Sequence, residues 1–265
     1  MLDACVDQGV GLRHIGMNSS TRVMAVTSHG SHELELPLLW SLCSALVEFG
    51  FGVTVLDGTV DEQLGEPGLI QILDTQHWQM GAREDKCSWS VIPAAIGFQR
   101  ICQLSSNEKV PLEELRGLFE SGHIVVIFAH SDLLSQLLAK SAIEPLLAVS
   151  SATNSLMTAY HALKRMHLVA QIHPMIVTIS HESAPHPFDP SALSGETLHD
   201  CARNFLGCNL RSPGVAILGS DDTTSPNMSQ LATQMLETAM PLARHIYATP
   251  TLRGTGPQVT LSGSH

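Results

Sequence analysis

The sequence predicts an α/β protein built on a doubly wound, mostly parallel β-sheet. Apolar β-branched runs alternate with helical segments along most of the chain, and the first such unit runs strand, loop, helix, strand. Strands that alternate with helices in this way form parallel sheets covered by helices on both faces. Of the 265 residues, 44% are hydrophobic and 15% are charged, which is enough apolar material for one large core.

The opening unit comprises residues 22–57. We expect residues 22–27 and 53–57 to form buried strands, residues 36–49 a helix, and residues 28–33 a polar loop between them. In many α/β proteins the loop between the first strand and the first helix holds phosphate, because free backbone N–H groups and the helix dipole point at it. This architecture therefore predicts a place for a nucleotide.

The later elements follow the same alternation. Asp132 is expected to cap a helix that begins near Leu133. Pro111 is expected to open an amphipathic helix. We predict strands at 88–94, 123–129, 146–150, 174–179 and 214–218. We also predict a short helix that begins at residue 66, helices at 112–121 and 227–239, and a helix that ends at Arg165.

The last predicted helix carries its apolar residues on one face. It has no Lys or Arg before Arg244 and contains Glu237. An amphipathic helix that lies on a membrane needs basic residues beside its apolar face. We therefore expect this helix to pack into the core rather than to associate with a membrane.

Charge and cysteine content narrow the class of partners. Lys and Arg number 14 against 25 Asp and Glu, a net charge of -11, which disfavours nucleic acid and favours protein partners. The six cysteines form no C-x-x-C pair, the chain opens without a signal sequence, and no apolar run approaches the ~18 residues of a membrane span. These features predict a cytoplasmic protein with reduced thiols.

The first loop reads S-H-G-S-H-E-L-E-L-P over residues 28–37, with one glycine and no lysine. The register resembles that of the MinD/ParA family of ATPases, a P-loop NTPase-like fold whose loop reads roughly S-G-K-G-G-V-G-K-T-T. An ungapped match brings Ser28 onto the family's serine and Asp57 onto its strand-end aspartate. The resemblance implies a degenerate phosphate loop. In this register, the family's first lysine becomes Gly30, and two of its glycines become Ser31 and His32. The phosphate-binding lysine becomes Glu35, and the Mg²⁺-binding threonine becomes Leu36. The aspartate that positions the attacking water becomes Thr59.

Glu35 is the replacement with the largest electrostatic consequence. Two unit charges ~4 Å apart at an effective dielectric of ~20 interact by about 4 kcal/mol, so exchanging an ammonium for a carboxylate costs roughly twice that. Micromolar binding is worth about 8 kcal/mol in total. We therefore expect ATP and Mg²⁺ binding to be lost and the protein to be a catalytically inactive pseudo-ATPase.

Residues 7–13 read D-Q-G-V-G-L-R. They resemble the N-terminal motif, close to D-Q-A-x-x-L-R, of the MinD-like flagellar number regulators of the FlhG (FleN) family. The matching residues are Asp7, Gln8, Leu12 and Arg13. In that family this segment docks as a helix on the signal-recognition-type GTPase FlhF and stimulates its GTP hydrolysis. The resemblance implies a regulator of flagellar number and placement that is recruited to the cell pole. It leaves open whether the protein forms a homodimer.

This interpretation divides the chain into three parts. Residues 1–20 form the partner-activating segment, residues 21–247 the MinD-like α/β domain, and residues 248–265 a tail rich in Gly, Ser, Thr and Pro that is expected to be flexible.

Two other interpretations stay open. One is a divergent active ATPase whose lysine comes from elsewhere, such as Lys86 or Lys140. The other is a nucleotide-free MinD-like scaffold in cellulose or pilus assembly, which needs no N-terminal motif.

No metal site is expected. Histidines and acidic residues gather in the first loop and again near residue 181, but neither group has the spacing of a zinc enzyme. The residues concerned are His29, His32 and Glu33, and His181, Glu182 and His186.

Overall fold

A computed structural model describes residues 20–63, 67–75, 89–105, 110–180, 190–217 and 226–242. The predicted partner-activating residues Asp7, Gln8, Leu12 and Arg13 and the predicted tail lie outside the described residues, as does Lys86.

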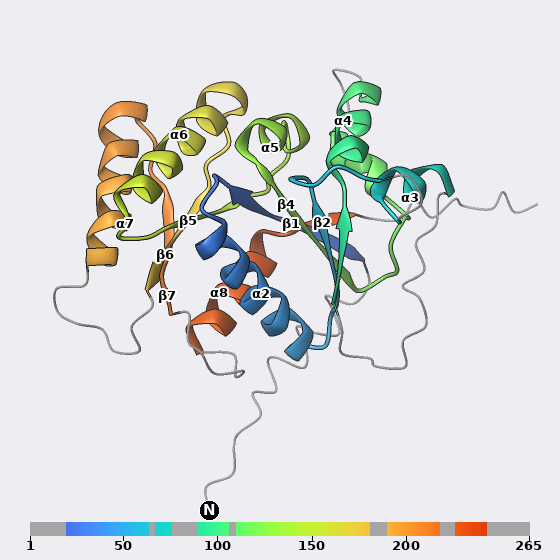
Figure 1. The fold of residues 1–265 in the computed structure, drawn as a ribbon, viewed down its shortest axis with the longest axis horizontal. Helices are drawn as coiled ribbons and strands as arrows, with labels where there is room; N and C mark the ends of the chain where they lie inside the picture. Colours follow the sequence, from blue (N-terminus) through green and yellow to red (C-terminus); the bar gives the residue numbers. More distant parts are fainter. Residues whose placement is uncertain are drawn as a thin grey trace, which may run out of the picture.

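One eight-stranded sheet forms the centre of the fold (Figure 1). Its strands are β1 (Thr21–Ser28), β2 (Gly52–Asp57), β3 (Trp89–Pro93), β4 (His123–His130), β5 (Leu146–Val149), β6 (Met175–Ser180), β7 (Arg211–Ile217) and β8 (Met240–Leu242). The strand order is β3-β2-β4-β1-β5-β6-β7, and these strands pair in parallel, whereas β8 pairs antiparallel with β1. The predicted doubly wound, mostly parallel sheet is confirmed.

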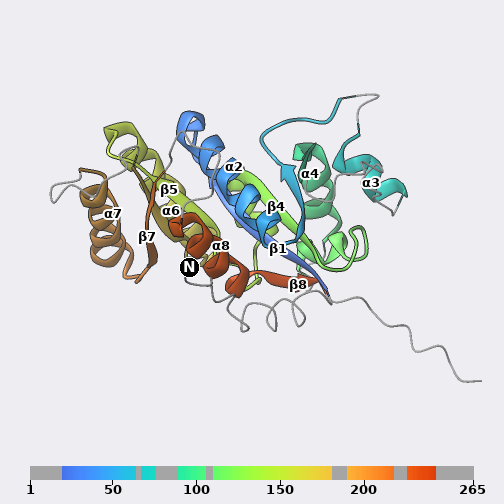
Figure 2. The same ribbon diagram turned by 90° about the horizontal axis from the view of Figure 1, so that it is seen from below.

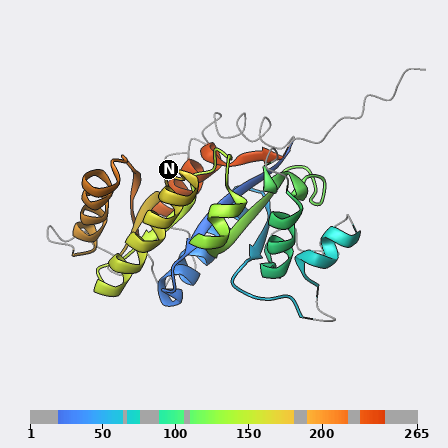
Figure 3. The ribbon, with the colours of Figure 1, turned by 90° about the horizontal axis from the view of Figure 1, so that it is seen from above.

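Helices cover both faces of this sheet. They are α2 (His32–Glu48), α3 (Leu69–Thr75), α4 (Ala95–Leu104), α5 (Ser131–Leu137), α6 (Thr153–Ala170), α7 (Pro190–Cys201) and α8 (Pro226–Thr238), with a 3₁₀ turn η1 (Pro111–Leu115) and a π-helical turn η2 (Ala202–Leu206). The helices α2 and α8 lie on one face (Figure 2), and α4 to α7 lie on the other (Figure 3). Both faces of the sheet are therefore buried.

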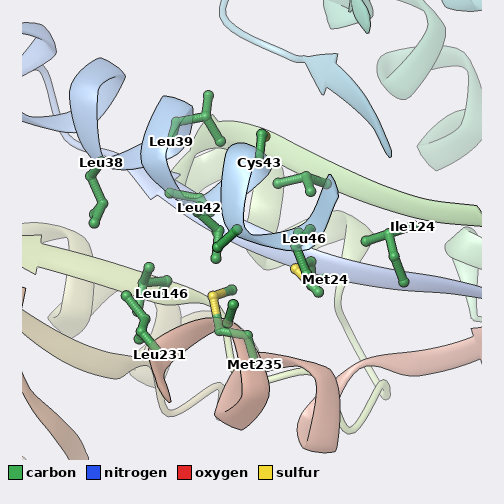
Figure 4. Packing of buried hydrophobic residues seen from close by; sticks show 14 of the residues in the cluster. Met24, Leu38, Leu39, Leu42, Cys43, Leu46, Ile124, Leu146, Leu231 and Met235 are labelled. Atoms are coloured by element: carbon green, nitrogen blue, oxygen red, sulfur yellow. The ribbon is translucent and has the colours of Figure 1, made fainter. Parts of the chain in front are cut away.

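The alternation of side chains along β1 shows how one strand serves both layers. Met24 and Val26 belong to the core under α2 and α8, whereas Val23 and Ala25 belong to the core under α4 and α5. Successive side chains of a strand point to opposite faces, so a strand buried on both faces reads as a continuous apolar run. Figure 4 shows the first of these cores, where Leu42 and Leu46 of α2 point toward β1 and α8.

The apolar face of α8 is buried as the sequence predicts. Its buried residues are Met228, Leu231, Ala232, Met235 and Leu236. Within the described ranges, none of the helices combines the length and the apolarity that crossing a bilayer requires.

The predicted helix at 112–121 is wrong. The chain forms only the 3₁₀ turn η1, and Gly117 then adopts a left-handed conformation with φ 79° that ends it. The apolar residues that suggested a helix are buried in a compact turn instead; they are Leu112, Leu115, Leu118 and Phe119.

The predicted capping role of Asp132 is also wrong. The helix α5 begins two residues earlier than predicted, at Ser131, and its N-cap is His130 without a side-chain cap. The Asp132 carboxylate instead forms an ion pair with Arg165 of α6. Both partners are more than half exposed, so this pair contributes little to stability.

His123 opens β4 as a buried histidine. Its Nε2 atom lies 2.8 Å from Thr54 Oγ1, and its ring stacks on Phe119 with centroids 5.9 Å apart. A Cβ on Gly52 would lie 2.7 Å from His123 Nδ1, so the absence of a side chain there makes room for the ring. Burial lowers the pKa of His123 from 6.5 to about 4, against a smaller opposite effect of Glu120. The ring is therefore neutral at neutral pH.

Candidate functional site

The candidate site lies at the carboxyl edge of the sheet, where β1, β4 and β2 end side by side. Ser28 pairs with His130 at the ends of β1 and β4, and Asp57 at the end of β2 pairs with Phe128. In open α/β sheets, ligands bind at this edge where the strand order changes direction. The loop that leaves β1 is therefore where a nucleotide would be expected.

This loop is shorter than predicted. The helix α2 begins at His32 rather than at residue 36, so only residues 29–31 connect it to β1. Gly30 adopts φ 92° within the loop, a conformation that other L residues rarely tolerate. His32 and Glu35 consequently lie in the first two turns of the helix, together with Leu36, which the sequence already placed in the helix.

The side chain of Glu35 fills the space inside this loop. Its Oε2 accepts the Ser28 hydroxyl hydrogen at 2.9 Å, and its Oε1 accepts the backbone N–H groups of His29 at 2.8 Å and Ser31 at 3.1 Å. The carboxylate is entirely buried. Backbone amides at this position of a P-loop fold are donors for phosphate. Here the chain's own carboxylate accepts their hydrogen bonds.

His29 fixes the loop to the neighbouring strand and helix. Its Nε2 donates to the Ala148 carbonyl of β5 at 2.9 Å and lies 3.4 Å from Glu35 Oε1. Its Nδ1 is hydrogen-bonded to Thr158 Oγ1 of α6 at 2.8 Å. A buried polar ring that is bonded at both nitrogens is held in one orientation, so the loop has little freedom to rearrange.

The position that matches the Mg²⁺-binding threonine carries no ligand for Mg²⁺. Leu36, which matches the Mg²⁺-binding threonine, is 48% exposed and carries no oxygen in its side chain. His32 is exposed, with its Nδ1 3.9 Å from Glu35 Oε2. The structure shows no group of three metal ligands at this loop among the residues it describes, while His181, Glu182 and His186 lie outside them.

Asp57 and Thr59 form a self-contained turn at the end of β2. One carboxylate oxygen, Asp57 Oδ1, accepts the N–H of Thr59 at 2.9 Å and its hydroxyl hydrogen at 2.6 Å. Between them, Gly58 donates its N–H to Phe128 at 2.7 Å, and a Cβ there would lie 2.9 Å from the Ala129 Cβ. This aspartate therefore holds its own turn against β4.

Lys140 does not stand at this edge. It follows α5, a helix that starts at the carboxyl edge directly after β4 and runs away from it. The structure thus gives no support to Lys140 as a substitute for the missing phosphate-binding lysine.

Two of the described cysteines are poor candidates for a nucleophile. Burial raises the pKa of Cys43 to about 12 and that of Cys102 to about 11. Both thiols stay protonated at neutral pH, and a protonated thiol is a poor nucleophile.

The sheet and its strand order form a P-loop NTPase-like α/β fold of the MinD/ParA kind. No family model matches the chain, and no curated protein matches it. Its structure is similar to that of a plasmid partition protein from Borrelia burgdorferi, with a TM-score of 0.52 and 12% identity over 83% of this chain and 99% of that chain. It is also similar to a chain of the MinC:MinD cell division protein complex of Aquifex aeolicus, with a TM-score of 0.53 and 12% identity over 84% and 98% of the two chains. At these identities the likeness shows the fold.

Proposed function

We propose that this protein is a catalytically inactive, nucleotide-independent scaffold with the MinD/ParA fold, which acts by binding other proteins. The observation that carries the proposal is the buried Glu35 carboxylate, which accepts the hydrogen bonds of the loop amides. A nucleotide would have to displace this carboxylate and break its bonds to Ser28, His29 and Ser31.

The energetic cost of that displacement is large. Charge-assisted hydrogen bonds contribute about 1.5 to 3 kcal/mol each, and three would have to be exchanged. A carboxylate left near a phosphate would add repulsion of about 4 kcal/mol at ~4 Å. The repulsion alone offsets about half of the roughly 8 kcal/mol that micromolar binding provides.

Titration of the full-length protein with ATP and Mg²⁺ in a calorimeter tests the nucleotide-independent part. We expect no saturable heat beyond that of ATP injected into buffer. A saturable isotherm with a submicromolar Kd would instead favour the divergent ATPase, and replacing Lys86 or Lys140 by alanine would then identify its lysine.

The partner that we propose is an FlhF-like GTPase, engaged by the N-terminal segment. The support for it is the spacing of Asp7, Gln8, Leu12 and Arg13 in the sequence, together with the MinD-like order of the strands. The corresponding role is to regulate the number and placement of flagella from the cytoplasm and the cell pole. The net charge of -11 also disfavours nucleic acid as the partner.

GTP hydrolysis by an FlhF-like GTPase tests this partner. We expect full-length protein and a peptide of residues 1–20 to stimulate hydrolysis equally with and without ATP. Gln8→Ala should abolish stimulation, whereas Asn18→Ala, a polar residue of the same segment outside the motif, should keep it. Absence of stimulation would remove the GTPase from the proposal and leave the nucleotide-independent scaffold in another assembly, such as cellulose or pilus assembly.

A further inference from the structure

Three potential metal ligands meet at the amino edge of β6 and β7, away from the loop between β1 and α2. His167 lies in the last turn of α6, His173 shortly before β6, and Cys208 between η2 and β7. One nitrogen of each histidine and the sulfur of Cys208 all lie within 4.8 Å of one another. His167 Nδ1 is 3.1 Å from His173 Nε2, and the two rings stack with centroids 5.2 Å apart.

The backbone brings His173 back onto the helix that carries His167. Gln171 ends α6 in the left-handed conformation, with φ 55°. Its N–H donates to the His167 carbonyl at 3.0 Å, and the N–H of Ile172 donates to the Met166 carbonyl at 3.2 Å. These bonds close the helix end and reverse the chain, so the two imidazoles are placed by backbone structure.

A second helix end supplies the sulfur. Gly207 ends η2 with φ 67°, and Cys208 then donates its N–H to the Ala202 carbonyl at 3.3 Å. Cys208 is buried, whereas His173 is exposed and His167 is partly exposed. The cluster is therefore open to solvent on the histidine side and closed on the sulfur side.

The distances suit a tetrahedral transition metal. With metal to nitrogen bonds of about 2.0 to 2.1 Å and metal to sulfur bonds of about 2.3 Å, neighbouring ligand atoms lie about 3.3 to 3.6 Å apart. The separation between the imidazole nitrogens, 3.1 Å, is already close to this range, and small side-chain rotations would bring the sulfur into it. Nitrogen and thiolate ligands together select zinc over magnesium or calcium.

We propose that His167, His173 and Cys208 bind a zinc ion, with the fourth coordination position open to water or to a partner's side chain. The negative end of the α6 dipole, beside His167, also favours a cation. A bound ion would link the segments that lead into β6 and β7, two strands that pair directly through Met175 and Arg211. This site is independent of the proposed function and of the nucleotide loop.

Cobalt titration of the full-length protein tests the site, because Co²⁺ takes zinc positions and gives a near-ultraviolet charge-transfer band when a thiolate binds it. We expect this band in the wild type and its loss in Cys208→Ser. Cys102→Ser, which removes a cysteine of α4, should keep the band. Zinc displacing cobalt from the protein should abolish the band stoichiometrically.

Calorimetry with ZnCl₂ tests the histidines. His173→Ala is expected to weaken binding of one zinc equivalent by at least about 100-fold, since even residues that only orient metal ligands change affinity 10- to 100-fold. His161→Ala, which removes an exposed histidine of α6 outside the cluster, should bind zinc as the wild type does. Because the chain has 14 histidines, the difference between these paired variants is the decisive readout. A cobalt complex without the thiolate band, or equal zinc binding by His173→Ala and His161→Ala, would overturn the proposal.

Discussion

Replacing Glu35 by alanine is expected to lower the free energy of unfolding by about 2 to 4 kcal/mol. The substitution removes the acceptor for the Ser28 hydroxyl and for the N–H groups of His29 and Ser31. Leaving buried donors without a partner costs about 1 to 3 kcal/mol each, and water entering the emptied loop recovers part of that cost. Urea unfolding at pH 7 measures the difference.

Glu33 supplies a matched control for this experiment. It is a glutamate in the same first turn of α2, but it is exposed. Glu33→Ala should change stability by about 0.5 kcal/mol or less. Equal stability of Glu33→Ala and Glu35→Ala would show that Glu35 does not hold the loop.

Inorganic phosphate should stabilise Glu35→Ala more than the wild type, because the freed amides at a helix N-terminus become an anion site.

Acid should destabilise the protein through His123. In the unfolded chain the pKa of this histidine returns to about 6.5, whereas burial lowers it to about 4 in the folded protein. Below pH 6.5 the unfolded state therefore binds more protons, and stability falls as the pH falls toward 4. The shift of about 2.5 pKa units corresponds to about 2 to 3 kcal/mol lost between pH 7 and pH 4.5.

The comparison with His123→Gln isolates this contribution. Glutamine retains a group able to bond Thr54 but does not titrate in this range. The wild type should lose about 2 to 3 kcal/mol more than this variant between pH 7 and pH 4.5, measured by urea unfolding at both pH values. His161→Gln, at an exposed histidine, should keep the wild-type pH dependence. If His123→Gln and the wild type lose the same amount, the neutral buried ring is excluded as a cause of acid sensitivity.

Most of the strands could be predicted closely from the sequence, because burial on both faces leaves a continuous apolar run, whereas β7 begins three residues before its predicted start and β8 was not predicted. The predicted strands at 53–57, 123–129, 146–150 and 174–179 agree with β2, β4, β5 and β6 to within one residue at each end. In these strands the local sequence favours an apolar, extended segment, and the position between two layers of helices requires the same.

Helix α4 shows why some elements could not be predicted. It has no capping side chain of its own, and Gly97 lies in its first turn. The N–H groups of Ile96 and Gly97 instead donate to the Glu62 carboxylate, at 2.7 and 2.8 Å, from the loop after β2. A cap supplied from a distant part of the chain leaves no local signal.

The site was predicted only in part for the same reason. The sequence indicates that Glu35 replaces a lysine and would repel phosphate. Its role as the acceptor for the loop amides depends on α2 starting at His32, which turns the carboxylate back over residues 29–31. The cluster of His167, His173 and Cys208 depends likewise on two helix ends that meet only in the folded protein.

The pairing of β8 with β1 joins the two ends of the described domain. Thr21 lies opposite Leu242, and Val23 lies opposite Met240. The two ends of the domain therefore lie side by side at the amino edge of the sheet. A short peptide that joins residues 242 and 21 would permit circular permutation. We therefore expect the strand order to survive a change in where the chain begins. New termini opened in a surface connection would move the attachment point of residues 1–19 while the eight-stranded sheet kept its order.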